Sequence, residues 1–224
     1  MSGPLSSGGV PDPVELADVL APRPVSSSEV VFSGHVWDVA TEVVDLGGPE
    51  PVRRDKVVHP GAVGILALDE QERVLLLRQY RHPVRHELWE VPAGLLDVDG
   101  EPPHEAAARE LAEEADVVAG RWDVLAEYYT TPGGSDEALR VYLARDLSPV
   151  PEADRFAREH EEADMEVRWV PLDDAVEAVL AGRLHNPTAV VGVLAAAASR
   201  ARGWSTLRPA GTPWPAFDDR RAQA

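Results

Sequence analysis

Hydrophobic and polar positions in the first third of the chain follow the pattern of short β-strands. Runs rich in valine and aromatic residues alternate with glycine, proline and other turn residues. The runs are 30–32, 36–39, 43–44 and 57–58, with a Gly-Gly-Pro break at 47–49. β-Branched residues bounded by such breaks are typical of paired strands. We therefore expect a small antiparallel strand unit over residues 29–58.

Two more strongly apolar runs follow the turn at 59–61. They cover 62–68 and 74–77, and the polar residues 69–72 separate them. Short runs that are apolar at nearly every position are typical of strands buried on both faces. Because the connection is short and polar, the pattern predicts that the two strands form a hairpin.

Later in the chain, helical and strand-like patterns are interleaved. A helix is predicted over 106–115, where Pro102 and Pro103 precede it at positions that need no backbone N–H donor. The other predicted elements are strands at 124–129 and 138–143 and helices at 173–182 and 187–201. Since no regular βαβ repeat is visible, this order favours an α/β fold with a mixed sheet and helices packed on it.

The chain has 224 residues, of which 44% are hydrophobic and 27% are charged. This is ordinary globular usage, and the length suits one domain with short extensions. Residues 1–28 are rich in proline, serine and glycine and are expected to form a flexible leader. The body is expected over 59–202. In the tail, 203–224, Trp204 and Trp214 indicate docking onto the body or onto a partner.

Charge narrows the possible partners. There are 39 acidic against 21 basic residues, a net charge of -18, which would repel nucleic acid as a polymer. A small anion stays possible if arginines and a divalent metal meet at one cleft. The chain has no cysteine, so a metal site must use oxygen or imidazole ligands. No apolar run approaches the ~20 residues that span a bilayer, and residues 1–5 do not begin a secretion signal. We expect no membrane partner and a cytoplasmic location.

Three glutamates on the predicted helix form the strongest candidate for chemistry. Glu110, Glu113 and Glu114 project within about 100° of one another on a helix of 3.6 residues per turn. Mg²⁺ or Mn²⁺ would offset their mutual repulsion and prefers oxygen ligands. Arg109, one turn from Glu105 and Glu113, is suited to orienting the acids. The alternative is a solvated acidic face, which a Glu-x-x-Glu-Glu run in so acidic a protein often is.

The surrounding residues favour the metal site. Gly94 and Glu101 precede the helix, and the chain continues as Arg-Glu-Leu-Ala-Glu-Glu from Arg109. This arrangement resembles the signature of the Nudix hydrolases. It departs from the common pattern twice: six residues instead of five separate Gly94 from Glu101, and Asp116 replaces a glycine. The first change lies in a loop, and aspartate is one of the few residues that tolerate the left-handed conformation expected at the second.

The resemblance implies a Nudix-type α/β/α sandwich and metal-dependent cleavage of a nucleoside diphosphate linked to another group. It implies that Glu110 and Glu114 are metal ligands, with Glu113 a further ligand and the carbonyl of Ala93 a backbone ligand. The metals would polarise pyrophosphate oxygens and activate the attacking water.

Outside the signature, Pro132 lies 16 residues beyond Asp116, as in Nudix members that hydrolyse ADP-ribose. Further segments resemble the bacterial ADP-ribose pyrophosphatase branch: 53–55, 59–63, 78–81, 131–137 and 161–165. The resemblance covers roughly residues 30–200. It implies conversion of ADP-ribose and water to AMP and ribose 5-phosphate by a homodimer in which the N-terminal strand unit reaches the partner. Trp37 would then lie at the interface, stack on adenine, or pack in the core.

Within that branch, the matching loop implies Glu162 as catalytic base, with Glu161 as the alternative. Arg54 and Arg81 are suited to binding the diphosphate, because guanidinium groups pair with phosphate oxygens through two hydrogen bonds. Pro132 and Gly133 are expected to contact substrate. Two other hypotheses stay open: the same reaction on another nucleoside diphosphate sugar such as GDP-mannose, and a non-catalytic Nudix-like module that senses a nucleotide.

Overall fold

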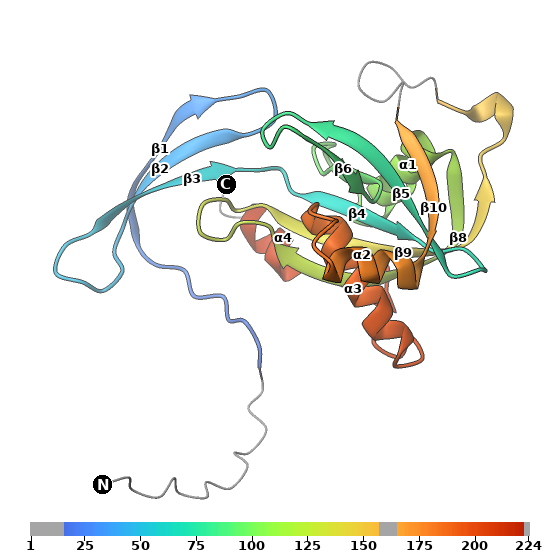
Figure 1. The fold of residues 1–224 in the computed structure, drawn as a ribbon. Coiled ribbons are helices and arrows are strands. Elements are labelled where there is room, and N and C mark those ends of the chain that lie inside the picture. The colour runs from blue at the N-terminus through green and yellow to red at the C-terminus, as the bar shows by residue number, and fades with distance from the viewer. Residues whose placement is uncertain (1–15, 157–164, 222–224) are drawn as a thin grey trace, which may run out of the picture.

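The structure, a computed structural model, describes residues 16–156 and 165–221. Its N-terminal sheet is antiparallel in the order β1-β2-β3 and projects from one side of the body (Figure 1). Its strands are β1 (Val25–Ser33), β2 (Asp38–Val44) and β3 (Val52–Val58). The predicted antiparallel strands are therefore present. β1 begins earlier than predicted, inside the segment expected as a flexible leader, because Val25 pairs with Val44 at the far end of β2.

The body contains two further sheets. The five-stranded sheet has the order β11-β8-β9-β4-β7, and the three-stranded sheet has the order β10-β5-β6. β4 and β9 run parallel while the other pairs are antiparallel, so the larger sheet is mixed. The bounds are β4 (Ala62–Ala67), β5 (Arg73–Arg81), β6 (His86–Glu90), β7 (Ala93–Leu95), β8 (Val117–Tyr129), β9 (Ala138–Pro149), β10 (Glu166–Pro171) and β11 (Arg208–Pro209).

The hairpin predicted between the first two buried strands is wrong. β4 and β5 lie in different sheets, and the bridge between Leu68 and Val74 joins them only at the turn. Both edges of β4 are taken, one by β9 and the other by β7, so β5 pairs instead with β6 and β10. The prediction failed because two apolar runs joined by a short polar turn look the same whether the strands pair or diverge.

Helices cover both faces of the sheets. They are α1 (Pro103–Ala115), α2 (Leu172–Leu180), α3 (Pro187–Arg200) and α4 (Pro215–Arg221), with a 3₁₀ turn at Glu152–Asp154. Alternate residues of β4 point to opposite sides: Val63 and Ile65 belong to the core cluster that contains the buried face of α1, whereas Leu66 belongs to the cluster that contains α2 and α3. The predicted α/β/α class is confirmed.

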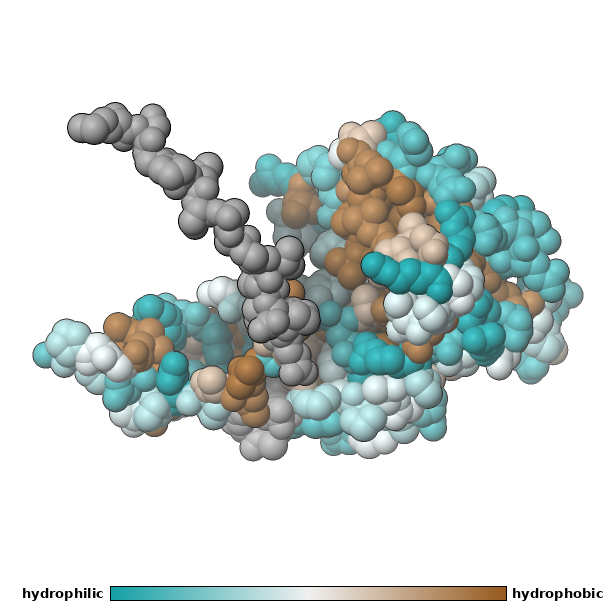
Figure 2. Space-filling model, turned by 90° about the horizontal axis from the view of Figure 1, so that it is seen from below, coloured by the Kyte–Doolittle hydropathy of each residue, from teal (hydrophilic) through white to brown (hydrophobic). Residues whose placement is uncertain are grey.

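α3 is apolar around almost its whole circumference. Its start is capped by Asn186, whose side-chain oxygen accepts a hydrogen bond from Ala189 N at 2.9 Å, and no charged residue occurs from 187 to 199. Val193 and Ala196 are buried, while Leu194 is 37% exposed. Figure 2 shows the hydrophobic band that this helix places on the surface. None of the described helices combines the length and the hydropathy needed to cross a membrane.

The C-terminal segment packs on the body of its own chain over the described residues. Trp214 and Phe217 are buried and their rings stack with centroids 5.0 Å apart. Trp204 is half-buried, and the Arg145 guanidinium lies 5.2 Å from the centre of its ring. The sequence predicted that these indoles dock either onto the body or onto a partner, and in the structure both indoles lie on the body.

Candidate active site

The helix that carries the signature, α1, ends where the sequence predicts but begins at Pro103, three residues before the predicted start at 106. Pro102 precedes it with extended backbone angles and Pro103 is its first residue. At the other end Asp116 has φ 53° and ψ 35°, and its N–H donates to the carbonyl of Ala112. The left-handed conformation expected of Asp116 is confirmed. α1 therefore presents residues 109–114 on a continuous helical turn.

Arg109 is the centre of an ion-pair network at this helix. Its Nε and Nη2 donate to the two carboxylate oxygens of Glu101 at 3.0 and 3.1 Å. Its Nη1 donates to Glu110 at 2.8 Å and to Glu113 at 3.2 Å. The predicted partner Glu105 is replaced by Glu101, because Glu105 lies on the exposed side of the first turn. One guanidinium thus orients three carboxylates.

The short strand β7 holds the other side of the acid cluster. Ala93 N donates to Glu114 at 2.9 Å, which fixes that carboxylate beside the β7 backbone. At the next residue, a β-carbon added to Gly94 would lie 2.1 Å from the Cδ of Glu110. Real atoms do not approach so closely, so the missing side chain of Gly94 provides the space that the Glu110 carboxylate occupies. Glycine is required here for close approach, whatever its backbone angles.

Electrostatics distinguish the acids. Burial raises the pKa of Glu110 above its ordinary value of 4.5, although the neighbouring Arg109 partly offsets this effect. The hydrogen bond from Arg109 lowers the pKa of Glu101, and the same pair raises the pKa of Arg109. Burial therefore disfavours the ionised form of Glu110, whereas the ionised form of Glu101 is stabilised by Arg109.

These residues fit a hard divalent cation in donor chemistry. All candidates offer oxygen, and a bound cation would favour the ionised form of the partly buried Glu110, which burial disfavours. Within residues 16–156 and 165–221, no three histidine, aspartate or glutamate side chains already converge as a metal-ligand group. The reason is visible in the network: Glu110 and Glu113 point to Arg109, and Glu114 points to Ala93 N.

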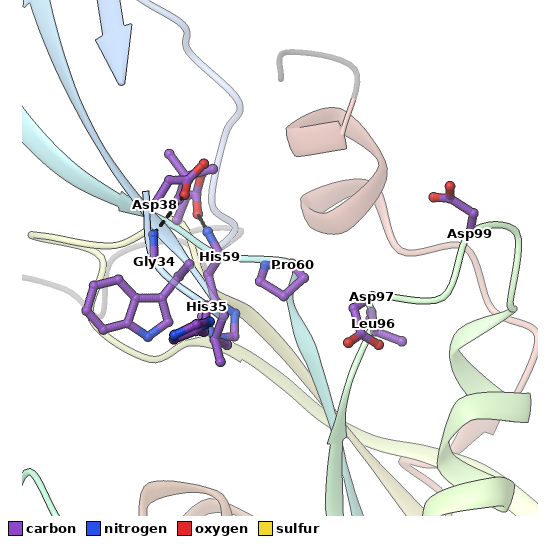
Figure 3. A pocket seen from close by; sticks show the side chains of 12 residues that line it. Gly34, His35, Asp38, His59, Pro60, Leu96, Asp97 and Asp99 are labelled. Atoms are coloured by element: carbon purple, nitrogen blue, oxygen red, sulfur yellow. Dashed lines mark hydrogen bonds between the residues drawn. The ribbon is translucent and has the colours of Figure 1, made fainter. Parts of the chain in front are cut away.

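A cleft of about 410 Å³ lies next to the loop that leads into α1, walled by three parts of the chain, with Asp136 contributed from a fourth. One wall is the loop between β7 and α1, which carries Asp97 and Asp99; the others are the β1–β2 loop with Trp37 and the β3–β4 connection with His59. Figure 3 shows His35, His59 and the aspartates around this space. Since Gly94 and Glu101 flank the same loop, a molecule in this cleft would lie close to the signature residues.

His59 joins the cleft to the loop that contains Pro132. Its Nδ1 accepts a hydrogen bond from Gly61 N at 3.1 Å, which leaves Nε2 as the protonated nitrogen of the neutral ring, 3.6 Å from Glu137. Its backbone N–H donates to Asp136 at 2.9 Å. Sequence reasoning missed this link, because its residues are 77 positions apart.

The remaining predicted residues are spread more widely. Arg54 lies on exposed β3 and donates to the carbonyl of Arg53. Arg81 donates through Nε and Nη2 to the two oxygens of Glu90, at 2.9 and 2.7 Å. Glu90 is 3% exposed, and its place inside an otherwise apolar run was the available signal for a buried ion pair. The hydrogen bonds described for Arg54 and Arg81 are thus with Arg53 and Glu90.

The loop residues Pro132 and Gly133 are exposed, and nothing lies within 4 Å of a β-carbon added to Gly133. This loop is tied to the end of β3, because Val57 N donates to the carbonyl of Gly134 at 2.9 Å. Glu161 and Glu162 lie outside the described residues.

Comparison with known proteins agrees with this geometry. The model of the NUDIX domain family matches residues 58–189, a span that includes β4, β7, α1 and the whole acid cluster. The chain belongs to the Nudix family.

Two curated Nudix relatives share much of the sequence. The ADP-ribose pyrophosphatase of Mycobacterium tuberculosis is 45% identical over 203 residues, which cover 88% of this chain and 95% of the relative. The protein of the same name from Bacillus subtilis is 38% identical over 161 residues, covering 71% of this chain and 84% of the relative.

Among solved structures, one described as an ADP compounds hydrolase superposes with a TM-score of 0.67. It covers 84% of this chain and 99% of its own, at 20% identity. This match supports the Nudix fold.

Proposed function

We propose that this Nudix protein hydrolyses ADP-ribose to AMP and ribose 5-phosphate. The observation that carries the proposal is the Arg109 network: one guanidinium holds Glu101, Glu110 and Glu113, and Gly94 of β7 makes room for Glu110. Two relatives named ADP-ribose pyrophosphatase, 45% and 38% identical, support the choice of substrate. The cleft beside the network is formed partly by the loop that connects β7 to α1.

The reaction breaks one P–O bond of the diphosphate bridge, and water supplies the oxygen that replaces it. Mg²⁺, or Mn²⁺ in its place, would be held by Glu110, Glu113, Glu114 and the Ala93 carbonyl, and would supply polarisation of the phosphate oxygens and activation of water. Arg109 keeps the acids oriented, and Ala93 N keeps Glu114 beside β7. Glu162, with Glu161 as the alternative, is proposed to accept the proton of the attacking water.

On the substrate side, Arg54 and Arg81 are proposed to bind the diphosphate. The guanidinium of Arg81 is already held in one orientation, because its Nε and Nη2 donate to Glu90; Arg81 would bind the diphosphate while it keeps this ion pair. Pro132 and Gly133 are proposed to contact the substrate from the loop that His59 and Glu137 connect to the cleft. Trp37, on the cleft wall, is available to stack on a base.

A homodimer formed through the N-terminal sheet is also proposed. All nine residues of β1 are exposed, and Phe32 is 56% exposed. A long edge strand with exposed apolar side chains is a surface that proteins ordinarily cover. Sedimentation velocity tests this: a dimer is expected, and Phe32→Glu should shift it toward monomer. A monomeric wild-type protein at micromolar concentration would contradict the proposal. The cytoplasmic location stays a prediction.

The deciding experiment measures AMP or GMP release from ADP-ribose, ADP-glucose, GDP-mannose, NADH and diadenosine polyphosphates, with Mg²⁺ and with chelator. We expect metal-dependent turnover that is fastest on ADP-ribose. Fastest turnover on GDP-mannose would replace the substrate while keeping the chemistry. Tight binding of ADP-ribose without turnover of any compound would favour the non-catalytic module.

A further inference from the structure

The C-terminal segment crosses back over the body and reaches the start of α1. β11 pairs with β8 through Arg208 and Val124, and the chain then runs to α4. Trp214 and Phe217 belong to the same buried cluster as Ala106, Ala107 and Leu111 of α1. Together with Pro102, Pro103 and His104 they also line a cavity of about 250 Å³ at the first turn of α1. The segment from Arg208 to Phe217 is called the C-terminal strap below.

A buried arginine fastens the strap to the sheet. Arg140 of β9 is 2% exposed, and it donates to the carbonyls of Thr212 at 2.8 Å and Pro213 at 3.1 Å. Its guanidinium lies 4.7 Å from the centre of the Trp214 ring. Glu127 on β8 completes the attachment, because it pairs with Arg140 and accepts a hydrogen bond from Arg208 at 3.1 Å. A buried, fully hydrogen-bonded guanidinium resists displacement, since leaving it unpaired would be costly.

The first turn of α1 needs such support. Pro102, at its start, provides no side-chain cap for the free N–H groups of the helix. Glu101, the residue before it, accepts two of the four hydrogen bonds that orient Arg109. A shift of this turn would therefore change the position of Glu101 and, through Arg109, of Glu110 and Glu113. The strap faces this turn across the cavity and joins the buried cluster of α1 through Trp214 and Phe217.

We infer that the C-terminal strap, through Trp214 and Phe217 and the Arg140 anchor, positions α1 so that its carboxylates can bind a divalent cation. The strap residues are positioning residues, because they share the buried cluster of α1 and make none of the hydrogen bonds described for the acid cluster. The inference rests on the proposed function in one respect: it takes the α1 acids to be the metal ligands.

The experiment compares Trp214→Ala with a matched variant, Trp204→Ala. Both variants remove a C-terminal tryptophan whose ring lies beside an arginine of β9. Trp214 belongs to the core cluster that contains α1, whereas Trp204 packs against the cluster that contains α2 and α3. Mn²⁺ binding is measured directly by electron paramagnetic resonance of the free ion, and Glu114→Gln identifies binding at the α1 site. Thermal unfolding and hydrogen exchange of the α1 amides are recorded for each variant.

Trp214→Ala should weaken Mn²⁺ binding about tenfold, as loss of an outer support of a metal site ordinarily does, and should reduce protection of the first α1 turn. Trp204→Ala should leave both unchanged even though it lowers the unfolding temperature. Trp214→Phe should restore most of the affinity. If Trp214→Ala does not fold, the milder Phe217→Leu takes its place. Equal effects of both tryptophan variants, or normal Mn²⁺ affinity in folded Trp214→Ala, would overturn the inference.

These readouts also separate the inference from the proposed function. A wild-type protein that binds Mn²⁺ at the α1 site and hydrolyses none of the compounds would refute the proposed activity while leaving the role of the strap testable. A wild-type protein with no Mn²⁺ site that depends on Glu114 would refute the metal assignment itself, and with it the inference.

Discussion

The acid cluster and the cleft beside it are built in opposite ways. Every described part of the cluster comes from residues 93–116, and its side chains are held by hydrogen bonds between β7, the following loop and α1. The cleft walls come from the β1–β2 loop, the β3–β4 connection and the loop after β7, with Asp136 contributed from a fourth place. The difference suggests that the chemistry is encoded locally, whereas substrate selection depends on how distant segments are assembled.

The two regions should therefore separate kinetically, and the largest effect is expected inside the cluster. Glu114→Gln keeps an oxygen that can accept the Ala93 N–H but removes the negative charge. We expect kcat to fall by at least about 10²-fold, since charge stabilisation by a metal contributes several kcal/mol. Steady-state kinetics on ADP-ribose over a range of Mg²⁺ measures this. Turnover equal to wild type would show that Glu114 is no metal ligand.

Two glycines offer a sharper contrast. In Gly94→Ala the new methyl group meets Glu110, so either the carboxylate or β7 must move, and we expect a loss of about 1–3 kcal/mol of stability and most of the activity. Gly48, in the N-terminal unit, has only the carbonyl of Glu50 at 3.9 Å near an added β-carbon. Gly48→Ala is the control and should change neither property. Chemical denaturation and turnover measure both, and similar losses in the two variants would contradict the close-packing argument.

On the cleft side, a change at His59 should affect KM more than kcat. His59→Asn keeps an acceptor for Gly61 N but cannot reach Glu137, so the Pro132 loop loses one attachment. Because the Nε2 of His59 lies 3.6 Å from Glu137, beyond hydrogen-bond distance, we expect KM for ADP-ribose to rise by at most about fivefold, the equivalent of up to about 1 kcal/mol. His59→Gln, which can extend an N–H toward Glu137, is the comparison. A fall in kcat with KM unchanged would place His59 with the chemistry instead.

The smallest effect concerns stability and pH in the metal-free protein. Burial raises the pKa of Glu110 above 4.5, so the folded chain holds this proton more tightly than the unfolded chain. The associated stability is full below about pH 4.5, the unfolded value, and is lost as pH rises through the raised pKa. Glu110→Gln should therefore raise the unfolding temperature at pH 7 by a few degrees while abolishing activity. An unchanged or lower unfolding temperature at pH 7 would contradict this account.

Much of the cluster could be predicted because its pieces are close in sequence. Helical periodicity alone places Glu110, Glu113 and Glu114 on one face, and Asp116 takes the left-handed conformation expected at the helix end. The partner of Arg109 could not be predicted from periodicity. Glu105 has the right helical spacing, but Glu101 sits in the loop before the helix, and only the path of that loop brings it to Arg109.

The pattern also does not predict β6, β7 or β10. These strands are short or carry several polar residues, as in His86–Glu90. They form because neighbouring strands offer free edges. The same reason explains the failed hairpin. Whether β4 pairs with β5 depends on β7 and β9, which occupy the two edges of β4 and both come after β5 in the chain.

By itself the sequence determined the α/β class, the strand-rich N-terminal unit, a helix over 106–115 and the acidic residue types on it, because these follow from local periodicity and residue chemistry. Only the tertiary structure decided that Glu110 fills the space left by Gly94, that His59 lies beside Glu137, and that Trp214 and Phe217 join the buried cluster of α1. Those contacts join residues far apart in the chain. Their energy comes from close packing and shared hydrogen bonds, and these exist only once the sheets and helices have come together.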